Sequence, residues 1–171
     1  MTNTLSHISH ISRCKPALGF IGFGAIAATV ASTAAFASLH LGIAPWAMFI
    51  GWVAYFTRPL SARQGAYTWL CLLSGLAVGA VAVVALQRLM PIMGSFALLM
   101  IVFVVAMIVV SMRAVRMLDN IPAWFLGLIA FFASHAEPSL VAISQLAAAG
   151  ALGTVAGWAS HRLQGRFAGA H

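Results

Sequence analysis

Long apolar stretches, nearly free of charged side chains, constrain this chain more than any other feature. Residues 17–41, 66–89, 94–112 and 139–160 form four such runs, and Arg88 is the one Lys, Arg, Asp or Glu within them. A helix needs about 20 apolar residues to cross a hydrocarbon core about 30 Å thick. The composition agrees, since 63% of the residues are hydrophobic and 6% are charged. We therefore predict an all-α membrane protein whose partner is the lipid bilayer.

Two shorter apolar runs, 45–56 and 122–133, decide the topology. Each begins with a proline and spans about 18 Å as a helix, so it either crosses the membrane or re-enters it. If all six runs cross and the N-terminus is cytoplasmic, eight basic residues lie inside and Arg88 alone lies outside; if the short runs re-enter, the division is five against four. The cytoplasmic set would be Arg13, Lys15, Arg58, Arg63, Arg113, Arg116, Arg162 and Arg166. We therefore expect six transmembrane segments, with both termini cytoplasmic.

The first run also has features of a secretory signal peptide. Arg13 and Lys15 precede it, and residues 35–37 have the small-x-small form of a cleavage site. Its uninterrupted length, residues 17–39, exceeds a signal h-region of about 7–15 residues and matches a full span. We expect the run to be retained, with residues 1–16 as a cytoplasmic tail, although charge counting alone leaves cleavage open.

An internal repeat links the two halves. The octet FIGWVAYF at 49–56 matches FLGLIAFF at 125–132, a spacing of 76 residues, and four further matches occur at a spacing of 74. These four matches are Gly79 with Gly153, Ala82 with Ala156, Arg88 with Arg162 and Leu89 with Leu163. The unit is long helix, short helix, long helix, so repeat one is 17–89 and repeat two is 94–163, leaving a tail at 164–171. Three crossings per unit invert the second copy. The alternative is that apolar sequence repeats by chance.

The two short runs also carry a family resemblance. W-A-x-F-[IL]-G-x-x-A-Y-F at 46–56 and I-P-A-W-F-L-G-x-x-A-x-F at 121–132 resemble domain-of-unknown-function family 1097, over approximately residues 42–163. The resemblance implies a small, multi-pass bacterial inner-membrane protein. It implies no chemistry, so it assigns no functional residue.

Glycines and aromatic residues of the short runs are candidates for a solute path. Glycine permits close approach of a solute or a second backbone, and aromatic rings can wall a narrow passage. The candidate path residues are Phe49, Gly51, Phe56, Phe125, Gly127, Phe132 and Gln145. The repeat places Gly51 and Gly127 at equivalent depths, so we expect them to approach each other near the centre of the fold. Helix packing is the alternative for the two glycines, and interhelical hydrogen bonding is the alternative for Gln145. GxxxG spacing assigns Gly75, Gly79, Gly153 and Gly157 to helix packing.

No charged side chain lies deep within a span, which favours a small uncharged or weakly polar solute over an ion-coupled pump. His40, His135 and Glu137 would stand at the extracellular ends and form a mouth. The alternative is that these histidines sit at a wet interface without a role.

Enzyme, metal and nucleic-acid functions find little support. The two carboxylates, Asp119 and Glu137, fall on opposite faces of the membrane, and Cys14 and Cys71 read as free thiols. His7 and His10 lack companion ligands, so we expect no metal and no cofactor. The net charge of +7 is scattered between apolar runs, which argues against nucleic acid. Two functions remain: a passive channel or facilitator for an unidentified solute, and a non-transporting subunit or assembly factor that binds partner helices. Association into a homo-oligomer stays open.

Overall fold

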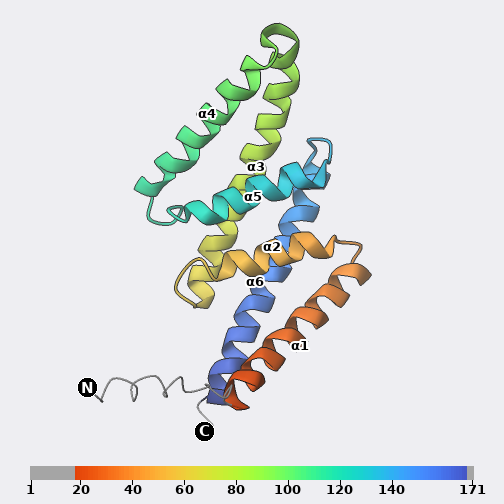
Figure 1. Cartoon of the computed structure of the whole chain (residues 1–171), viewed down its shortest axis with the longest axis vertical. Helices are drawn as coiled ribbons and strands as arrows, with labels where there is room; N and C mark the ends of the chain where they lie inside the picture. The colour runs from red at the N-terminus through yellow and green to blue at the C-terminus, as the bar shows by residue number, and fades with distance from the viewer. Residues whose placement is uncertain (1–17, 169–171) are drawn as a thin grey trace, which may run out of the picture.

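The computed structural model describes the backbone of residues 18–168 and the side chains of residues 21–167 (Figure 1). The expected N-terminal tail, with Cys14 and both of its histidines, lies outside the described residues. Within them the chain is all-α, with six α-helices and one 3₁₀ helix. The elements are α1 (Leu18–His40), α2 (Pro45–Tyr55), α3 (Ala62–Met93), α4 (Phe96–Ser111), η1 (Met112–Ala114), α5 (Ile121–Ser134) and α6 (Leu140–Ala168).

The prediction of four long membrane helices is confirmed. Four helices are long and apolar enough to cross a membrane: Ile21–His40, Ala62–Met93, Phe96–Ala114 and Leu140–Phe167. The two short helices, α2 and α5, have 11 and 14 residues. Helix α6 runs to Ala168, so it includes much of the segment that we expected to be a tail. Helices of this length and apolarity indicate a membrane protein.

Local signals explain where several helices begin and end. The Ser61 hydroxyl accepts a hydrogen bond from the Gln64 amide at 3.2 Å and caps α3. Proline occupies the first turn of both short helices, where a missing N–H leaves no helix hydrogen bond unmade. Gly94, with φ of 56°, ends α3 just after Pro91.

Each short helix packs mainly against the long helix of the other half of the chain. Helix α2 lies on α6, and α5 lies on α3, while α1 flanks α6 and α4 flanks α3. In Figure 1 the two short helices cross the middle of the molecule, between the α3–α4 pair above and the α1–α6 pair below. Because each short helix contacts a long helix from the other half, the two halves of the chain form one packed unit.

The two short helices bury the same faces. The buried residues of α2 are Ala47, Met48, Gly51, Ala54 and Tyr55. Their counterparts 76 positions later in α5 are also buried: Ala123, Trp124, Gly127, Ala130 and Phe131. Helix α5 buries Leu128 in addition. The sequence match at this spacing is therefore also a match in packing.

Glycines set the closeness of these contacts. A Cβ on Gly153 of α6 would overlap the backbone of Met48, and one on Gly75 of α3 would overlap the backbone of Trp124. Met48 and Trp124 are corresponding residues of the short helices, 76 positions apart. The glycines that contact them, Gly153 and Gly75, are therefore corresponding residues of the long helices, and they are 78 positions apart. The spacing of 74 taken from residue identities is one helical turn away from this register, because small residues recur every four positions in both helices.

Apart from the α3–α4 turn at the top, the connections between helices lie at two opposite edges of the molecule (Figure 1). The α2–α3 loop and the segment between η1 and α5 lie at the left edge. The α1–α2 and α5–α6 loops lie at the right edge. Each edge has a pocket, described below.

Candidate functional site: two loop pockets

The larger pocket, which we call the charged pocket, lies between the α2–α3 loop and the segment that leads into α5. Its volume is about 820 Å³. It is lined by Thr57, Arg58, Pro59, Arg63, Gln64, Tyr67, Arg116, Met117, Asp119, Asn120 and Pro122. Polar side chains from distant parts of the sequence thus face one cavity.

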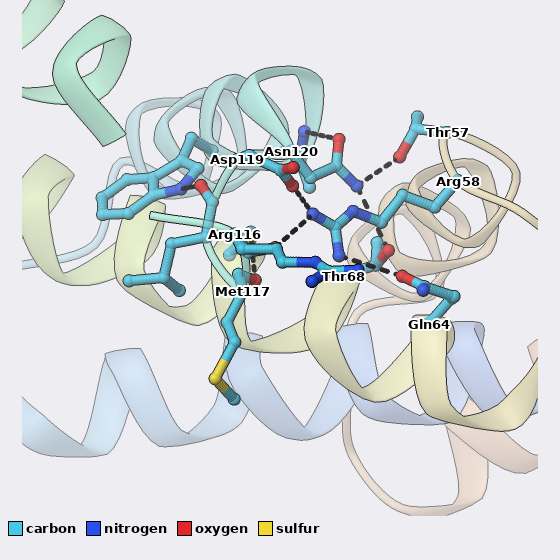
Figure 2. A network of polar contacts seen from close by, with 12 residues as sticks. Thr57, Arg58, Gln64, Thr68, Arg116, Met117, Asp119 and Asn120 are labelled. Carbon is cyan, nitrogen blue, oxygen red and sulfur yellow. Dashed lines mark hydrogen bonds and ion pairs between the residues drawn. The ribbon is translucent and has the colours of Figure 1, made fainter. Parts of the chain in front are cut away.

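Arg58 holds the two sides of this pocket together (Figure 2). Its guanidinium forms an ion pair with Asp119, donates to Gln64 Oε1 at 3.0 Å and donates to the Arg116 carbonyl at 3.4 Å. The Arg58 side chain is 11% exposed, against 43% for Asp119. A guanidinium so shielded from water needs these partners, because an unpaired buried charge is costly.

Asn120 is the buried centre of the same network. Its side-chain amide donates to the Thr57 hydroxyl at 2.7 Å and to the Thr68 hydroxyl at 3.1 Å, as Figure 2 shows. Its side-chain oxygen, Oδ1, accepts from the Ala123 backbone amide at 3.4 Å and caps α5. One side chain therefore ties the end of α2, the body of α3 and the start of α5.

Two further arginines stand at the rim of the charged pocket. Arg63 Nε donates to the Tyr67 hydroxyl at 3.0 Å, and its guanidinium lies 5.5 Å from the centroid of that ring. The Arg116 guanidinium has no hydrogen bond or ion pair within residues 18–168, although its carbonyl accepts from Arg58. Three guanidinium groups thus line the pocket with one carboxylate, and its net charge is positive.

A smaller pocket lies at the opposite edge, and we call it the uncharged pocket. Its volume is about 260 Å³. It is lined by Gly42, Ile43, Ala44, Trp46, Ala47, Ser134, Ala136, Ala142, Gln145 and Leu146.

Several of its residues occupy positions that correspond, by sequence spacing, to residues of the charged pocket. At the loop spacing of 76, Ala44 corresponds to Asn120 and Ser134 to Arg58; at the long-helix spacing of 78, Gln145 corresponds to Tyr67. The two pockets therefore have corresponding frames and different side chains.

The expected path glycines have backbone for neighbours. A Cβ on Gly51 would overlap Gly150, and one on Gly127 would overlap Leu72. We expected Gly51 and Gly127 to approach each other at the centre of the fold, and this is wrong. Each faces a different long helix, because α2 packs mainly against α6 and α5 packs mainly against α3.

The other candidate residues spread over the surface. The four phenylalanines, Phe49, Phe56, Phe125 and Phe132, are 41% to 46% exposed. Gln145 lines the uncharged pocket. The three expected mouth residues, His40, His135 and Glu137, are exposed. His40 packs against Phe36 with ring centroids 4.3 Å apart. None of the three lines the uncharged pocket, although Ser134 and Ala136, which flank His135 in the sequence, do.

The GxxxG glycines lie where the short helices cross. Beside the contacts of Gly75 and Gly153, a Cβ on Gly79 would come within 3.1 Å of Phe131 Cβ. One on Gly157 would come within 3.1 Å of Tyr55 Cβ. These two aromatic rings are corresponding residues, 76 positions apart.

Sequence reasoning missed the charged pocket. Arg58, Arg116 and Asp119 stand in loops, where we read basic residues only as topology signals. The one local signal was Asn120, a good N-cap residue directly before Ile121-Pro122 at a helix start. Within residues 18–168 no group of three or more His, Cys, Asp or Glu side chains is placed to hold a metal ion.

No curated protein and no solved structure matches the chain. The model of one protein family matches residues 17–165, which is longer than the segment that carried the resemblance and includes α1. The family resemblance is thereby confirmed. The chain belongs to the family described as "Protein of unknown function (DUF1097)".

Proposed function

We propose that this chain is a passive facilitator that moves a small polar solute across the bacterial inner membrane, built as an inverted repeat of three helices. The observation that carries the proposal is the pair of pockets at opposite edges, formed by corresponding segments of the two halves. Inverted repeats of this kind support alternating access, in which one side of the site opens as the other closes. The two volumes, about 820 and 260 Å³, fit a state that is open at the charged pocket.

Six crossings with cytoplasmic termini accord with this arrangement. The described ends of α1 and α6 lie together, since Gln164 Nε2 donates to the Phe23 carbonyl at 3.0 Å. Six crossings would place the charged pocket on the cytoplasmic side, where basic residues accumulate. A cysteine in place of Pro59 should then react with an impermeant maleimide only from the cytoplasm, and one in place of Glu137 only from outside. Labelling of both from the same side would overturn the topology.

The glycine contacts suggest how the pockets would alternate. Both short helices rest on long helices through close backbone contacts at Gly51 and Gly127. The Thr154 hydroxyl also donates a hydrogen bond to the Gly51 carbonyl, at 3.3 Å. Small shifts of packed helices are a common form of domain movement. Movement of α2 along α6, and of α5 along α3, would close one loop pocket while the other opens.

Flux through proteoliposomes is the direct test. Purified protein would be reconstituted and assayed with a panel of small solutes, with empty liposomes as the baseline. Pro59 and Met117 line the charged pocket from opposite sides, so a cleavable cross-link between cysteines at these positions should hold the pocket open. This variant would carry alanine at Cys14 and Cys71. We expect flux to stop on cross-linking and to return on cleavage, while the single-cysteine variants stay active.

A non-transporting membrane subunit is the second candidate, and the surface of α4 favours it. Large apolar side chains are exposed along this helix, including Phe96 at 74%, Leu99 at 71% and Phe103 at 64%. Such a face can receive a partner helix as well as lipid. Baseline flux for every solute, together with recovery of one defined membrane partner by cross-linking from Leu99, would favour this candidate over the facilitator.

A further inference from the structure

We propose that the charged pocket binds a small oxyanion, of the carboxylate or phosphate class. The inference deepens the proposed function, on which it rests for its meaning in transport, by naming the class of solute. It also replaces the expectation of an uncharged solute, which considered only the membrane-spanning segments. Of the charged residues of this pocket, Arg58, Arg116 and Asp119 lie in loops and Arg63 lies in the first turn of α3, outside the apolar runs.

The charge balance favours an anion. Arg58, Arg63 and Arg116 line the cavity together with one carboxylate, Asp119. Since Asp119 is paired with Arg58, two guanidinium groups stay uncompensated. Residues lining the uncharged pocket carry no formal charge, so the positive charge belongs to one edge and not to the shared frame.

The N-terminal ends of two helices add to the positive electrostatic potential of the charged pocket. Two helices begin at the charged pocket: α3, of 32 residues, after Ser61, and α5, of 14 residues, after Asn120. Each helix N-terminus carries about half a positive charge, and the effect is strongest within the first turn. Helix starts that converge on a basic cavity favour an anion beyond the arginines themselves.

The available donors identify the binding groups. Arg116 has a guanidinium without a partner in the described part of the chain, and Arg63 uses only Nε, toward Tyr67. Both therefore have N–H groups free to take an oxyanion in the two-pronged geometry that guanidinium favours. Arg58 is occupied by Asp119 and Gln64, so its role is to position the pocket wall.

The competing explanation is that these arginines serve only as topology signals. Arg113 provides the matched control, because it precedes Arg116 by three positions, is exposed and does not line the pocket. If both arginines are only topology signals, replacing either one should have the same effect on anion binding. If the pocket is an anion site, only the replacement of Arg116 should weaken binding.

Binding to the purified full-length protein in a phosphate-free maltoside detergent tests the proposal. Calorimetric titrations would use inorganic phosphate and acetate as probes, with glycerol as the neutral comparison. We expect phosphate or acetate to bind and glycerol not to bind. Arg116→Gln and Arg63→Gln should each weaken binding about tenfold or more, as expected for loss of a charge-assisted hydrogen bond. Arg113→Gln should leave it unchanged.

Two outcomes would overturn the proposal: no binding of either anion, or equal weakening by Arg113→Gln and Arg116→Gln. Competition by phosphatidylglycerol would support the oxyanion and identify a lipid headgroup as its source. Failure of the proposed function is separable from failure of this inference. Anion binding without any flux would defeat the facilitator alone, whereas flux of glycerol with no anion binding would defeat the anion site alone.

Discussion

The short helices start with the same backbone hydrogen bonds at the two edges of the molecule, but the side chains around these starts differ. At the uncharged edge, the Ala44 carbonyl accepts from the amides of Ala47 and Met48, at 3.1 and 3.4 Å. At the charged edge, the Asn120 carbonyl accepts from the amides 76 positions later, at 3.1 and 3.3 Å. The polar triad Thr57, Thr68 and Asn120 is replaced by Ala133, Leu146 and Ala44.

This difference separates what the fold needs from what one edge adds. The uncharged edge forms the same helix start with alanine at the cap, so the backbone arrangement does not require a buried carboxamide. Burial of Asn120 is favourable only because its hydrogen bonds are made. A network that folding does not require is better explained by the pocket it supports.

The largest expected effect concerns what the edges share. Gly51→Leu and Gly127→Leu should each destabilise the protein by about 3 kcal/mol or more, because the new side chain meets backbone that cannot move aside. Thermal unfolding in detergent, or failure to recover folded protein, would measure this. The two substitutions should do similar damage if the two halves are packed alike.

Gly24→Leu is the matched control. Nothing lies within 4 Å of a Cβ at Gly24, so the substitution should change stability by less than about 0.5 kcal/mol. Full stability of the Gly51 variant would contradict the close contact with α6. A large difference between the Gly51 and Gly127 variants would break the correspondence between the two halves.

The next effect removes the polar difference itself. Asn120→Ala gives the charged edge the residue found at Ala44, and it leaves the buried Thr68 hydroxyl without its donor. We expect a loss of about 2 kcal/mol in the free energy of unfolding, from the lost cap and hydrogen bonds. Chemical unfolding in mixed micelles would measure it.

A second variant tests the reason for that loss. Thr68→Val removes the hydroxyl while keeping the shape of the side chain. Combined with Asn120→Ala, it should cost less than the sum of the two single changes, since the double variant leaves fewer buried polar groups unpaired. Strict additivity would mean that the amide and the hydroxyl do not interact.

The long helices could be predicted because apolar run length alone determines them. Residues 66–89 were enough to place α3, although the helix extends by four residues at each end through Ala62–Met93. The N-terminal extension contains Arg63 and Gln64, which an apolar run excludes, and the C-terminal extension contains Pro91, which is unfavourable inside a helix. The register between long helices was displaced by one turn, because residue identities in a small-residue pattern do not determine which glycine meets which backbone.

The charged pocket was beyond sequence reasoning for a different reason. Arg58 and Asp119 lie 61 positions apart, in two loops that are brought together by the packing of α5 against α3. Apolar periodicity carries no information on that meeting. The octet match placed the short helices in corresponding positions, and it said nothing of the loops that follow them.

A smaller effect is expected for the ion pair at the charged edge. Asp119→Asn removes the charge that faces Arg58. Because the carboxylate is 43% exposed, water already weakens the attraction, and we expect a loss of about 0.5 to 1 kcal/mol that shrinks at high salt. Glu137→Gln at the opposite edge is the control and should be neutral at any salt concentration. Equal, salt-independent losses would remove the electrostatic contrast between the edges.

The smallest effect, and the only stabilising one, concerns the backbone of the uncharged edge. His135 ends α5 in the left-handed conformation, with φ of 48° and ψ of 21°. Residues with a Cβ adopt this region at a cost of roughly 1 kcal/mol, whereas glycine does not. His135→Gly should therefore raise the free energy of unfolding by about 0.5 kcal/mol, part of the gain being offset by the greater freedom of glycine in the unfolded chain. Differential scanning calorimetry of the purified variant would show a small rise in Tm.

At the corresponding position, 76 residues earlier, stands Pro59, whose ring fixes φ near −65°. Pro59→Gly should therefore lower the free energy of unfolding instead. Opposite signs at these two positions would mark where the chain leaves the two short helices differently, whereas equal signs would mean that both loops place the same demand on the backbone.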